Sequence, residues 1–243
     1  MRAIHYLAAI ALGLAGSLAV AAEPEQAIRE TLKSLQSDME IISVSRSPMA
    51  GLYQVELKGG RHLYASPDGQ FVIQGYLYQY KDGQAVNLTE QAQGESVVKE
   101  IGSIPEKDMV IFSPDNPKTE ITVFTDTDCP YCQKLHAEVP ELNRRGVAVR
   151  YLAFPRQGLS SHGASVLEYV WCAGDRKMAM NRAKSQEDVP KAKCDNPVAR
   201  QYALGQQIGI QGTPAIILAN GQIIPGYQPA NVLAAEALKA KAK

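Results

Sequence analysis

The chain has 243 residues, and its 25 basic side chains balance 25 acidic ones, so that the formal net charge is zero. A balanced composition lacks the electrostatic footprint that favours nucleic acid or an anionic membrane surface, and neither kind of partner is expected. The length suffices for one large domain or two small ones.

The N-terminus has the three parts of a secretory signal peptide. Arg2 provides a positive charge, residues 7–20 are apolar, and Ala19-Val20-Ala21-Ala22 offers small residues for cleavage before Glu23. The apolar stretch of about 14 residues is shorter than the roughly 20 that a membrane-spanning helix needs. We therefore expect residues 1–22 to be removed and the mature chain to be soluble in an oxidising compartment, where disulfides persist. A buried N-terminal helix is the alternative.

Residues 23–88 are predicted to form a small α+β domain. An amphipathic helix over residues 25–36 has Ile28, Leu32 and Leu35 at helical spacing. Strands separated by turns follow at residues 41–45, 52–57, 61–65, 70–78 and 85–88. A unit of about 65 residues is at the lower end of what a single core stabilises, so oligomerisation would supply the missing burial.

Residues 89–107 are predicted to link this domain to the rest of the chain. The segment 89–100 is polar and helical with Thr89 as its N-cap, and Gly102 and Pro105 then break the helical pattern. We interpret the segment as an interdomain helix and a hinge. A surface helix without a linking role is the alternative.

Residues 108–243 follow a β-α-β pattern with an inserted helical region, which predicts an α/β domain. Strands are expected at residues 109–112, 120–124, 146–154, 215–218 and 222–224. Helices are expected at residues 129–140 with a kink at the proline, 161–183, 197–208 capped by Asn196, and 229–241.

Two cysteines at C-x-x-C spacing, Cys129 and Cys132, follow a predicted strand and begin a predicted helix. This places Cys129 at the helix N-cap and Pro130 at the first helical position, where its missing N–H costs nothing. The free amides and the positive end of the helix dipole favour an anion there, and the thiolate is the nucleophile in thiol chemistry. We predict that Cys129 attacks disulfides and that Cys132, one turn further and less exposed, resolves the mixed disulfide.

Other uses of this cysteine pair are less well supported by the sequence. A closed zinc site usually has four ligands, and the nearby candidate, His136, is more typical of a solvated helix residue. A c-type haem site needs histidine directly after the second cysteine, where Gln133 stands. A metal site and a purely structural bridge remain the alternatives to a redox pair.

The remaining cysteines, Cys172 and Cys194, lie 22 positions apart, and neither has a C-x-x-C partner. An even cysteine count in an exported chain favours pairing, so we predict a structural disulfide that stabilises the domain by about 3 kcal/mol. The alternative is a second redox relay, but neither cysteine follows a helix start or a Pro-aromatic pair.

Several sequence runs carry a resemblance to known proteins. The C-x-x-C at a strand-to-helix junction and the distant Thr213-Pro214 before a strand and hairpin resemble the thioredoxin fold. Over essentially the whole mature chain the sequence is similar to the DsbC/DsbG family of periplasmic disulfide isomerases. The runs that carry this similarity are Phe124-Thr125-Asp126, Cys129 to Leu135, Arg150 to Arg156, Gly212-Thr213-Pro214 and Pro225-Gly226-Tyr227. The filler Pro130-Tyr131 departs from the Gly-Tyr of the isomerase branch and also occurs in the DsbG branch and in glutaredoxins, which bears on redox poise.

The resemblance implies a thioredoxin-like catalytic domain with a helical insertion and a dimerisation role for residues 23–88. It implies that Pro214 is a cis-proline facing the cysteines and that the backbone of Thr213 pairs with an extended substrate. The pair Cys172 and Cys194 fits the family's structural disulfide, which the DsbG branch is not expected to carry. The implied partners are misfolded disulfide-containing exported proteins, a second copy of the chain, and a membrane reductase of the DsbD type as electron donor. No cofactor and no metal are expected.

Taken together, these features predict a periplasmic protein disulfide isomerase and reductase whose dimer cleft adds chaperone activity. C-x-x-C chemistry permits either redox direction, and the reduction potential decides it. The rivals are a dithiol oxidase, a reductase of sulfenic acids as in the DsbG branch, and a non-enzymatic chaperone whose cysteines only lock the fold.

Overall fold

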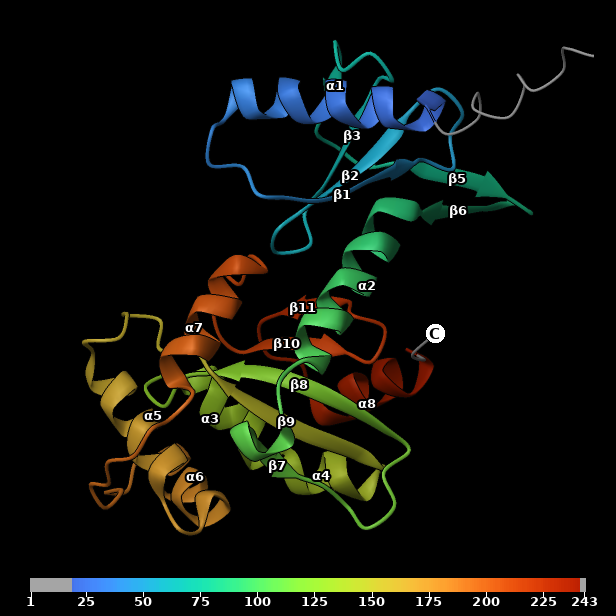
Figure 1. Cartoon of the computed structure of the whole chain (residues 1–243). Coiled ribbons are helices and arrows are strands. Elements are labelled where there is room, and N and C mark those ends of the chain that lie inside the picture. The colour runs from blue at the N-terminus through green and yellow to red at the C-terminus, as the bar shows by residue number, and fades with distance from the viewer. Residues whose placement is uncertain (1–18, 241–243) are drawn as a thin grey trace, which may run out of the picture. The chain divides into compact units, whose positions relative to one another are not determined.

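The computed structural model of the protein describes residues 19–240 (Figure 1). Residues 1–18, which hold most of the predicted signal peptide, lie outside the described residues, so that assignment stays a prediction. The chain divides into two compact units. One comprises the chain up to Leu57 together with Leu63–Gly75, and the other comprises Lys58–His62 together with the chain from Tyr76 onward.

The first unit packs one helix, α1 (Ala19–Leu35), on a four-stranded sheet. The sheet has the order β1 (Ile41–Arg46), β2 (Tyr53–Leu57), β3 (His62–Ala65), β4 (Val72–Ile73). The helix buries Ile28 and Leu32 against Val55, Leu63 and Ala65 of the sheet. The two helix positions are one turn apart and therefore lie on one face, as the sequence pattern predicts. The helix begins at Ala19 and not at residue 25 as expected.

The strand predicted over residues 70–78 is wrong. Only β4 pairs with β3, and the chain leaves the sheet before Gly75. A separate hairpin follows, formed by β5 (Tyr78–Lys81) and β6 (Gln84–Asn87). Its turn uses Asp82 and Gly83, both at positive φ, which is the geometry that tight hairpins require. A glycine within a strand pattern weakens pairing, and apolar alternation alone does not reveal such a break.

Helix α2 (Leu88–Gly102) begins at an asparagine cap. The side chain of Asn87 accepts a hydrogen bond from the backbone N–H of Glu90 at 3.2 Å, so Asn87 is the N-cap and the prediction of Thr89 is wrong. The Thr89 hydroxyl instead accepts a hydrogen bond from the backbone N–H of Leu77 at 2.8 Å. After α2, the single turn η1 (Glu106–Asp108) leads into the second sheet.

The second sheet has five strands in the order β11-β10-β8-β9-β7. Their bounds are β7 (Val110–Phe112), β8 (Thr119–Thr125), β9 (Val147–Ala153), β10 (Ala215–Leu218) and β11 (Ile223–Pro225). Strands β8 and β9 are parallel, and the other pairs are antiparallel. A parallel pair needs a crossover connection, which α3 (Pro130–Ala137) and α4 (Val139–Arg144) provide. The central strand β8 therefore leads directly into the cysteine pair.

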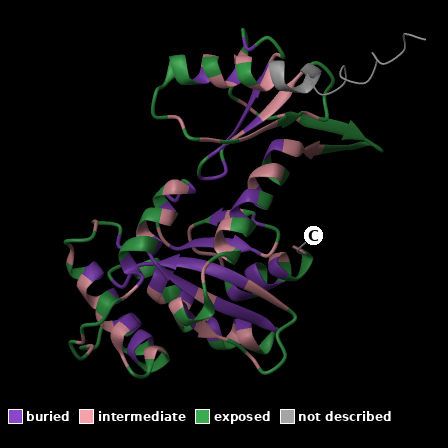
Figure 2. Ribbon diagram, in the orientation of Figure 1, coloured by how far each residue is buried: buried purple, intermediate pink, exposed green. Residues whose placement is uncertain are grey.

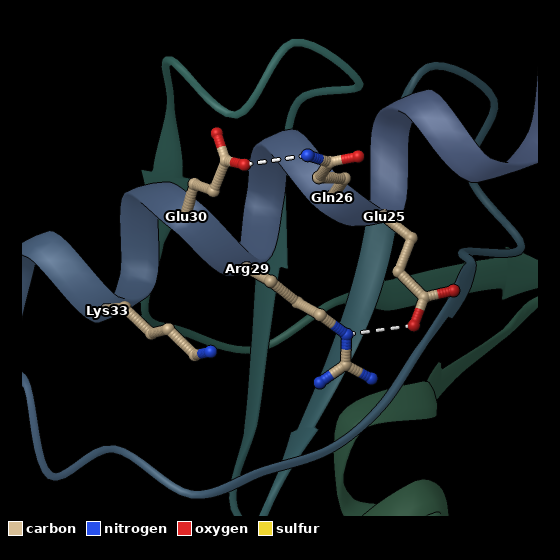
Figure 3. A pocket seen from close by; sticks show the side chains of 5 residues that line it. All are labelled: Glu25, Gln26, Arg29, Glu30 and Lys33. Carbon is tan, nitrogen blue, oxygen red and sulfur yellow. Dashed lines mark hydrogen bonds and ion pairs between the residues drawn. The ribbon is translucent and has the colours of Figure 1, made fainter.

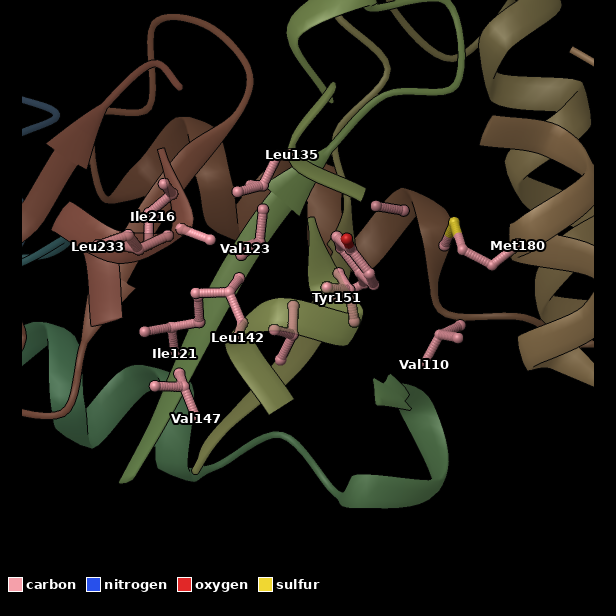
Figure 4. Close-up of a cluster of buried hydrophobic side chains, with 14 of the residues drawn as sticks. Val110, Ile121, Val123, Leu135, Leu142, Val147, Tyr151, Met180, Ile216 and Leu233 are labelled. Atoms are coloured by element: carbon pink, nitrogen blue, oxygen red, sulfur yellow. The ribbon is translucent and has the colours of Figure 1, made fainter. Parts of the chain in front are cut away.

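The central strands of this sheet are largely buried (Figure 2), and apolar side chains cover both of its faces. Alternation along β10 sends Ile216 and Leu218 to one face and Ala215 and Ile217 to the other. The larger layer, drawn in part in Figure 4, includes side chains of α3, α4 and α8 (Ala230–Lys239). The smaller layer includes Val97 of α2 and partly buried residues of α7 (Val198–Gln207).

Helix α7 approaches the sheet closely because Gly205 has no side chain. A Cβ atom at Gly205 would lie 2.5 Å from the ring of Phe154, much nearer than a van der Waals contact. The first residue of α7 is held by Asn196, whose side chain accepts a hydrogen bond from the N–H of Val198 at 3.2 Å. Asn196 therefore caps the helix through its side chain, as predicted, although the N-cap position itself is occupied by Pro197.

The inserted region contains two helices where one was predicted over residues 161–183. Helix α5 (His162–Cys172) ends before Gly174, and α6 (Arg176–Lys184) starts at its own cap, Asp175, whose side chain accepts a hydrogen bond from the N–H of Met178 at 2.9 Å. A disulfide joins Cys172, at the end of α5, to Cys194, in the segment before α7.

We predict that replacing both Cys172 and Cys194 with alanine lowers the free energy of unfolding by about 3 kcal/mol, because the bridge closes a loop of this size in the unfolded chain. Urea unfolding of the double variant and the wild type would measure this difference. The alkylation rate of Cys129 should stay largely unchanged, because the bridge restricts the chain and has no part in thiol exchange. Loss of turnover in a fully folded variant would contradict this and indicate a redox relay.

Candidate active site

The cysteine pair sits where β8 passes into α3. Cys129 is the N-cap of α3, and Pro130 is its first helical residue, as the sequence predicts. The sulfur of Cys129 accepts a hydrogen bond from the backbone N–H of Cys132 at 3.2 Å. Both cysteines are free thiols, and each is only 1% exposed. The expected contrast in exposure between them is therefore not present at residue level, and their surroundings distinguish them instead.

The Thr213-Pro214 segment lies against the cysteines although it is far away in sequence. The peptide bond between these two residues is cis. In its protonated form, the Cys129 thiol donates a hydrogen bond to the backbone carbonyl of Thr213 at 3.2 Å. The position follows from the antiparallel pairing of β10 with β8, in which Ala215 is paired with Phe124. Among the described residues, the buried hydroxyl of Thr213 has no hydrogen-bond partner.

The surroundings shift the pKa values of the two thiols in opposite directions. The neighbouring Cys132 side chain lowers the pKa of Cys129 from 9.0 to about 5, against the opposing effect of burial, and the charge of Arg156 adds to the lowering. Burial, followed by the hydrogen bond with Cys129, raises the pKa of Cys132 well above 9.0. At neutral pH the pair therefore consists of a Cys129 thiolate and a protonated Cys132.

An ion pair shapes the loop that precedes Cys129. The carboxylate of Asp126, buried on the loop, accepts hydrogen bonds from the backbone N–H and the Nε of Arg156, both at 3.0 Å. The same guanidinium donates to the backbone carbonyl of Asp128 at 3.0 Å. Arg156 was not among the predicted site residues. No local signal marks it, because it approaches the cysteines only through the pairing of β9 with β8.

Aromatic rings lie beside the motif. The ring of Tyr131, which is exposed, stacks on that of Tyr227 with 6.4 Å between centroids. The Lys134 ammonium lies 4.4 Å above the Tyr227 ring centroid. The carboxylate of Glu138 accepts hydrogen bonds from the Tyr227 hydroxyl and, at 2.5 Å, from the N–H of Ala230, the first residue of α8. This cluster ties the end of α3 to the start of α8.

The interpretation of His136 as a solvated helix residue is wrong. Its ring nitrogens are engaged with the Tyr151 hydroxyl at 3.0 Å and the Asn181 side chain at 2.9 Å. Burial lowers the pKa of His136 to about 4, so the ring is neutral at physiological pH. His136 is covered because α6 of the insertion packs on this side of α3. The spacing of residues within α3 does not reveal this contact.

Other candidate sites offer less chemistry. Among residues 19–240, no group of three or more His, Cys, Asp or Glu side chains gathers in a way that could hold a metal ion. A shallow hollow along α1 is lined by five polar or charged side chains (Figure 3). Four of the five are paired with each other, Arg29 with Glu25 at 2.8 Å and Gln26 with Glu30 at 2.9 Å. None of the helices in the described part of the chain has both the length and the apolar character to cross a membrane.

A thioredoxin-like sheet that presents one stabilised thiolate and one buried thiol at a strand-to-helix junction defines a thiol–disulfide oxidoreductase. Residues 105–241 match the thioredoxin-like domain family, and residues 19–90 match the disulfide bond isomerase protein N-terminal domain. The chain belongs to the DsbC family of thiol:disulfide interchange proteins.

Three relatives illustrate the extent of the match. The thiol:disulfide interchange protein DsbC of Salmonella typhimurium is 40% identical over 209 residues, which cover 86% of this chain and 85% of that protein. DsbC of Escherichia coli K12 is 38% identical over 205 residues, or 84% of each chain. The crystal structure of a disulfide interchange protein from Neisseria gonorrhoeae is 31% identical, with a TM-score of 0.52, and covers 58% of this chain and 100% of that one.

We predict that the rate of Cys129 alkylation by iodoacetamide rises through pH 5 and is flat above about pH 6.5, because the thiolate is the reacting form. Arg156→Met should move the midpoint to higher pH, since it removes a positive charge that favours the thiolate. Arg144→Met, which removes an arginine paired with Glu141 on α4, is the matched control and should leave the midpoint in place. A wild-type midpoint near that of an ordinary thiol would contradict the assignment.

Proposed function

We propose that the protein is a disulfide isomerase and reductase of exported proteins, with Cys129 as nucleophile and Cys132 as resolving thiol. The observation that carries this proposal is the opposite acidity of the two thiols within one C-x-x-C motif. A thiolate at neutral pH can attack a disulfide, and a protonated neighbour does not compete with it. Pro130 and Tyr131 support the site as the first residues of α3.

The reaction begins when the Cys129 thiolate attacks one sulfur of a client disulfide. A bond forms between Cys129 and that sulfur, the client bond breaks, and the other client sulfur leaves as a thiolate. In isomerisation, another client thiol attacks the mixed disulfide and returns Cys129 to its reduced form. In reduction, Cys132 attacks Cys129 and releases the client as a dithiol. Isomerisation needs no net electrons, whereas every reduction leaves the Cys129–Cys132 pair oxidised.

Client binding is assigned to Thr213 and Pro214. Both precede β10 directly, so their backbone stands at the edge of the site beside the Cys129 sulfur. An extended client segment could add to this edge as a short strand, with main-chain hydrogen bonds that do not depend on sequence. The unpartnered Thr213 hydroxyl offers a further polar group to such a segment.

The cellular setting follows from the predicted signal peptide and the disulfide. A chain exported to the periplasm meets an oxidising environment, in which Cys172 and Cys194 stay paired. The same environment would oxidise Cys129 and Cys132, so an electron donor must keep this pair reduced. A membrane reductase of the DsbD type is the proposed donor.

We assign dimerisation to the N-terminal domain, residues 23–88, with residues 89–107 as linker and 108–243 as catalytic domain. The match of residues 19–90 to the family's N-terminal domain supports this division. The segment 76–80 also carries three exposed aromatic side chains, which are Tyr76, Tyr78 and Tyr80. Concentrated exposure of this kind in a folded chain is typical of an interaction surface. A dimer would enclose a client between two catalytic sites and add chaperone activity.

Two enzymatic rivals and one non-enzymatic rival remain to be tested. A dithiol oxidase and a DsbG-like reductase of sulfenic acids would use the same motif, but the Cys172–Cys194 bridge favours the isomerase branch. A pure chaperone would not need an acidic Cys129 and should keep its activity after that thiol is alkylated.

We predict that Cys129→Ser abolishes the refolding of scrambled ribonuclease, because no other thiol in the motif is ionised at neutral pH. Cys132→Ser should keep part of this activity and accumulate mixed disulfides with the client, since the resolving thiol is absent. Non-reducing gels and regain of ribonuclease activity measure the two outcomes. If the two variants showed each other's phenotypes, the assignment of attacking and resolving thiols would be wrong.

We predict that a fragment starting near Ser103 is monomeric, keeps simple thiol–disulfide exchange and loses most isomerase activity. The cysteine pair and the Thr213-Pro214 edge lie within the fragment, but a single site cannot hold a misfolded client through repeated exchange. Light scattering and ribonuclease refolding on the fragment and on the full mature chain provide the comparison. A monomeric mature chain, or a fragment that isomerises as well as the whole, would contradict the dimer model.

A further inference from the structure

A buried lysine lies behind the cysteine pair. Lys184 is the last residue of α6, in the inserted helical region, and only 5% of its surface is exposed. Its ammonium donates a hydrogen bond to the Thr125 hydroxyl at 2.6 Å and another to the Asp126 backbone carbonyl at 2.8 Å. Both acceptors lie at the end of β8, immediately upstream of Cys129. The insertion thus places a cation under the strand end that carries the active site.

The charge of Lys184 has no carboxylate partner within residues 19–240. Asp126 offers it only a backbone oxygen, because the Asp126 carboxylate is paired with Arg156. The two hydrogen bonds use two of the three donors of an ammonium group. A buried charge without a counter-ion opposes folding, so its presence at this position calls for an anion formed during function.

The packing of α6 on α3 places Cys132 beside this charge. Asn181, one turn before Lys184 on α6, is hydrogen-bonded to the ring of His136, which lies one turn after Cys132 on α3. Cys132 is therefore the neighbouring group suited to become that anion. Burial raises the pKa of Cys132, and the charge of Lys184 counteracts this by lowering it. Burial likewise lowers the pKa of Lys184, and Cys132 raises it more than Asp126, Cys129 or Asp128 does. By contrast, the positive charge that lowers the pKa of Cys129 comes from Arg156. Arg156 therefore lowers the pKa of Cys129 and Lys184 lowers that of Cys132, although each cation interacts with both sulfurs.

We propose that Lys184 is a positioning residue that supplies the counter-charge for the Cys132 thiolate when Cys132 resolves a mixed disulfide. The inference rests on the proposed function, since it adds a charge partner to the resolving step. In that step the Cys132 thiol loses its proton to solvent, and its sulfur forms a bond with the Cys129 sulfur. The bond from Cys129 to the client sulfur breaks, and the electron pair leaves on the client sulfur, which takes up a proton. The cysteine pair is oxidised and the client sulfur is reduced.

The other groups around Lys184 do not replace it in this role. Burial lowers the pKa of His136 to about 4 and raises the pKa of Tyr151 above its ordinary value, so both are neutral near pH 7. The Tyr151 ring centroid lies 5.9 Å from the Lys184 ammonium. Arg156 is always charged, but it is held by the Asp126 carboxylate. The ionisable groups that interact with Lys184 from the adjoining elements are Cys129, Cys132, Asp126, Asp128, His136 and Tyr151.

Reaction of the full chain, with Cys129 and Cys132 reduced, with dithionitrobenzoate separates the attack of Cys129 from the attack of Cys132. Both appear in one absorbance trace of released thionitrobenzoate. The attack of Cys129 releases a first thionitrobenzoate and leaves a second one bound, and the attack of Cys132 releases the second. The first phase therefore reports the proposed function, and the second reports the role of Lys184. Lys184→Gln keeps N–H donors for Thr125 and Asp126 but removes the charge. Lys184→Met removes both, and Lys177→Met on the exposed side of the same helix is the matched control.

We expect the second phase to slow about 3- to 10-fold in both Lys184 variants at neutral pH. A rise of one to two units in the Cys132 pKa lowers the thiolate fraction about 10- to 100-fold, and the higher nucleophilicity of a more basic thiolate offsets roughly half of this on a logarithmic scale. The first phase should change less than about twofold, and the Lys177→Met variant should match the wild type in both phases. The wild-type advantage should also vanish as pH rises and Lys184 loses its proton, which a structural role would not produce.

A folded Lys184→Gln variant whose second phase has the wild-type rate would overturn the inference. A slow second phase in Lys184→Met alone would overturn it as well, because hydrogen bonding or packing would then explain the effect. With either of these two results, the proposed function would still stand as long as the wild type shows the rapid first phase. Absence of the first phase in the wild type would instead overturn the proposed function and this inference together.

Discussion

The antiparallel pairing of β10 with β8 is the constraint on which the site depends. It brings Thr213, 84 positions further along the chain, to the sulfur of Cys129. The parallel pairing of β8 with β9 likewise brings Arg156 to the loop before the motif. A helix N-terminus alone would favour a thiolate only modestly. Because the charge of Arg156 adds to the lowering of the Cys129 pKa, this acidity is a property of the assembled sheet as well as of the C-x-x-C motif.

The motif itself could be predicted from sequence because its physics is local. The positions of Cys129 and Pro130 at the start of a helix follow from helix-capping preferences, and the family resemblance, now confirmed, added Thr213 and Pro214. Residues such as Arg156 and Lys184 were not predicted, because they reach the site through strand pairing and helix packing. The broken strand after Ile73 was missed for a related reason, since apolar alternation does not show whether a partner strand is present.

The helical insertion contributes more to the site than its position in the sequence indicates. Its helix α6 covers α3, engages His136 through Asn181 and places Lys184 under the end of β8. The insertion thus covers a face of the catalytic helix with a partly buried polar cluster that includes His136, Asn181 and Lys184. A thioredoxin-like fold without this layer would expose the same face to water, so the acidity of its second cysteine would have to be set by other groups.

The disulfide between Cys172 and Cys194 means that this protein itself depends on correct disulfide pairing. Four cysteines can pair in three ways, and only one of these leaves Cys129 and Cys132 free to cycle without disturbing the bridge. During synthesis the cysteines of the motif emerge first, before either partner of the bridge. Until Cys194 is available, an oxidant of the compartment can therefore join Cys172 to a thiol of the motif instead of to its native partner. Its maturation depends on correct pairing within a molecule whose function, as proposed here, is to correct pairing in others.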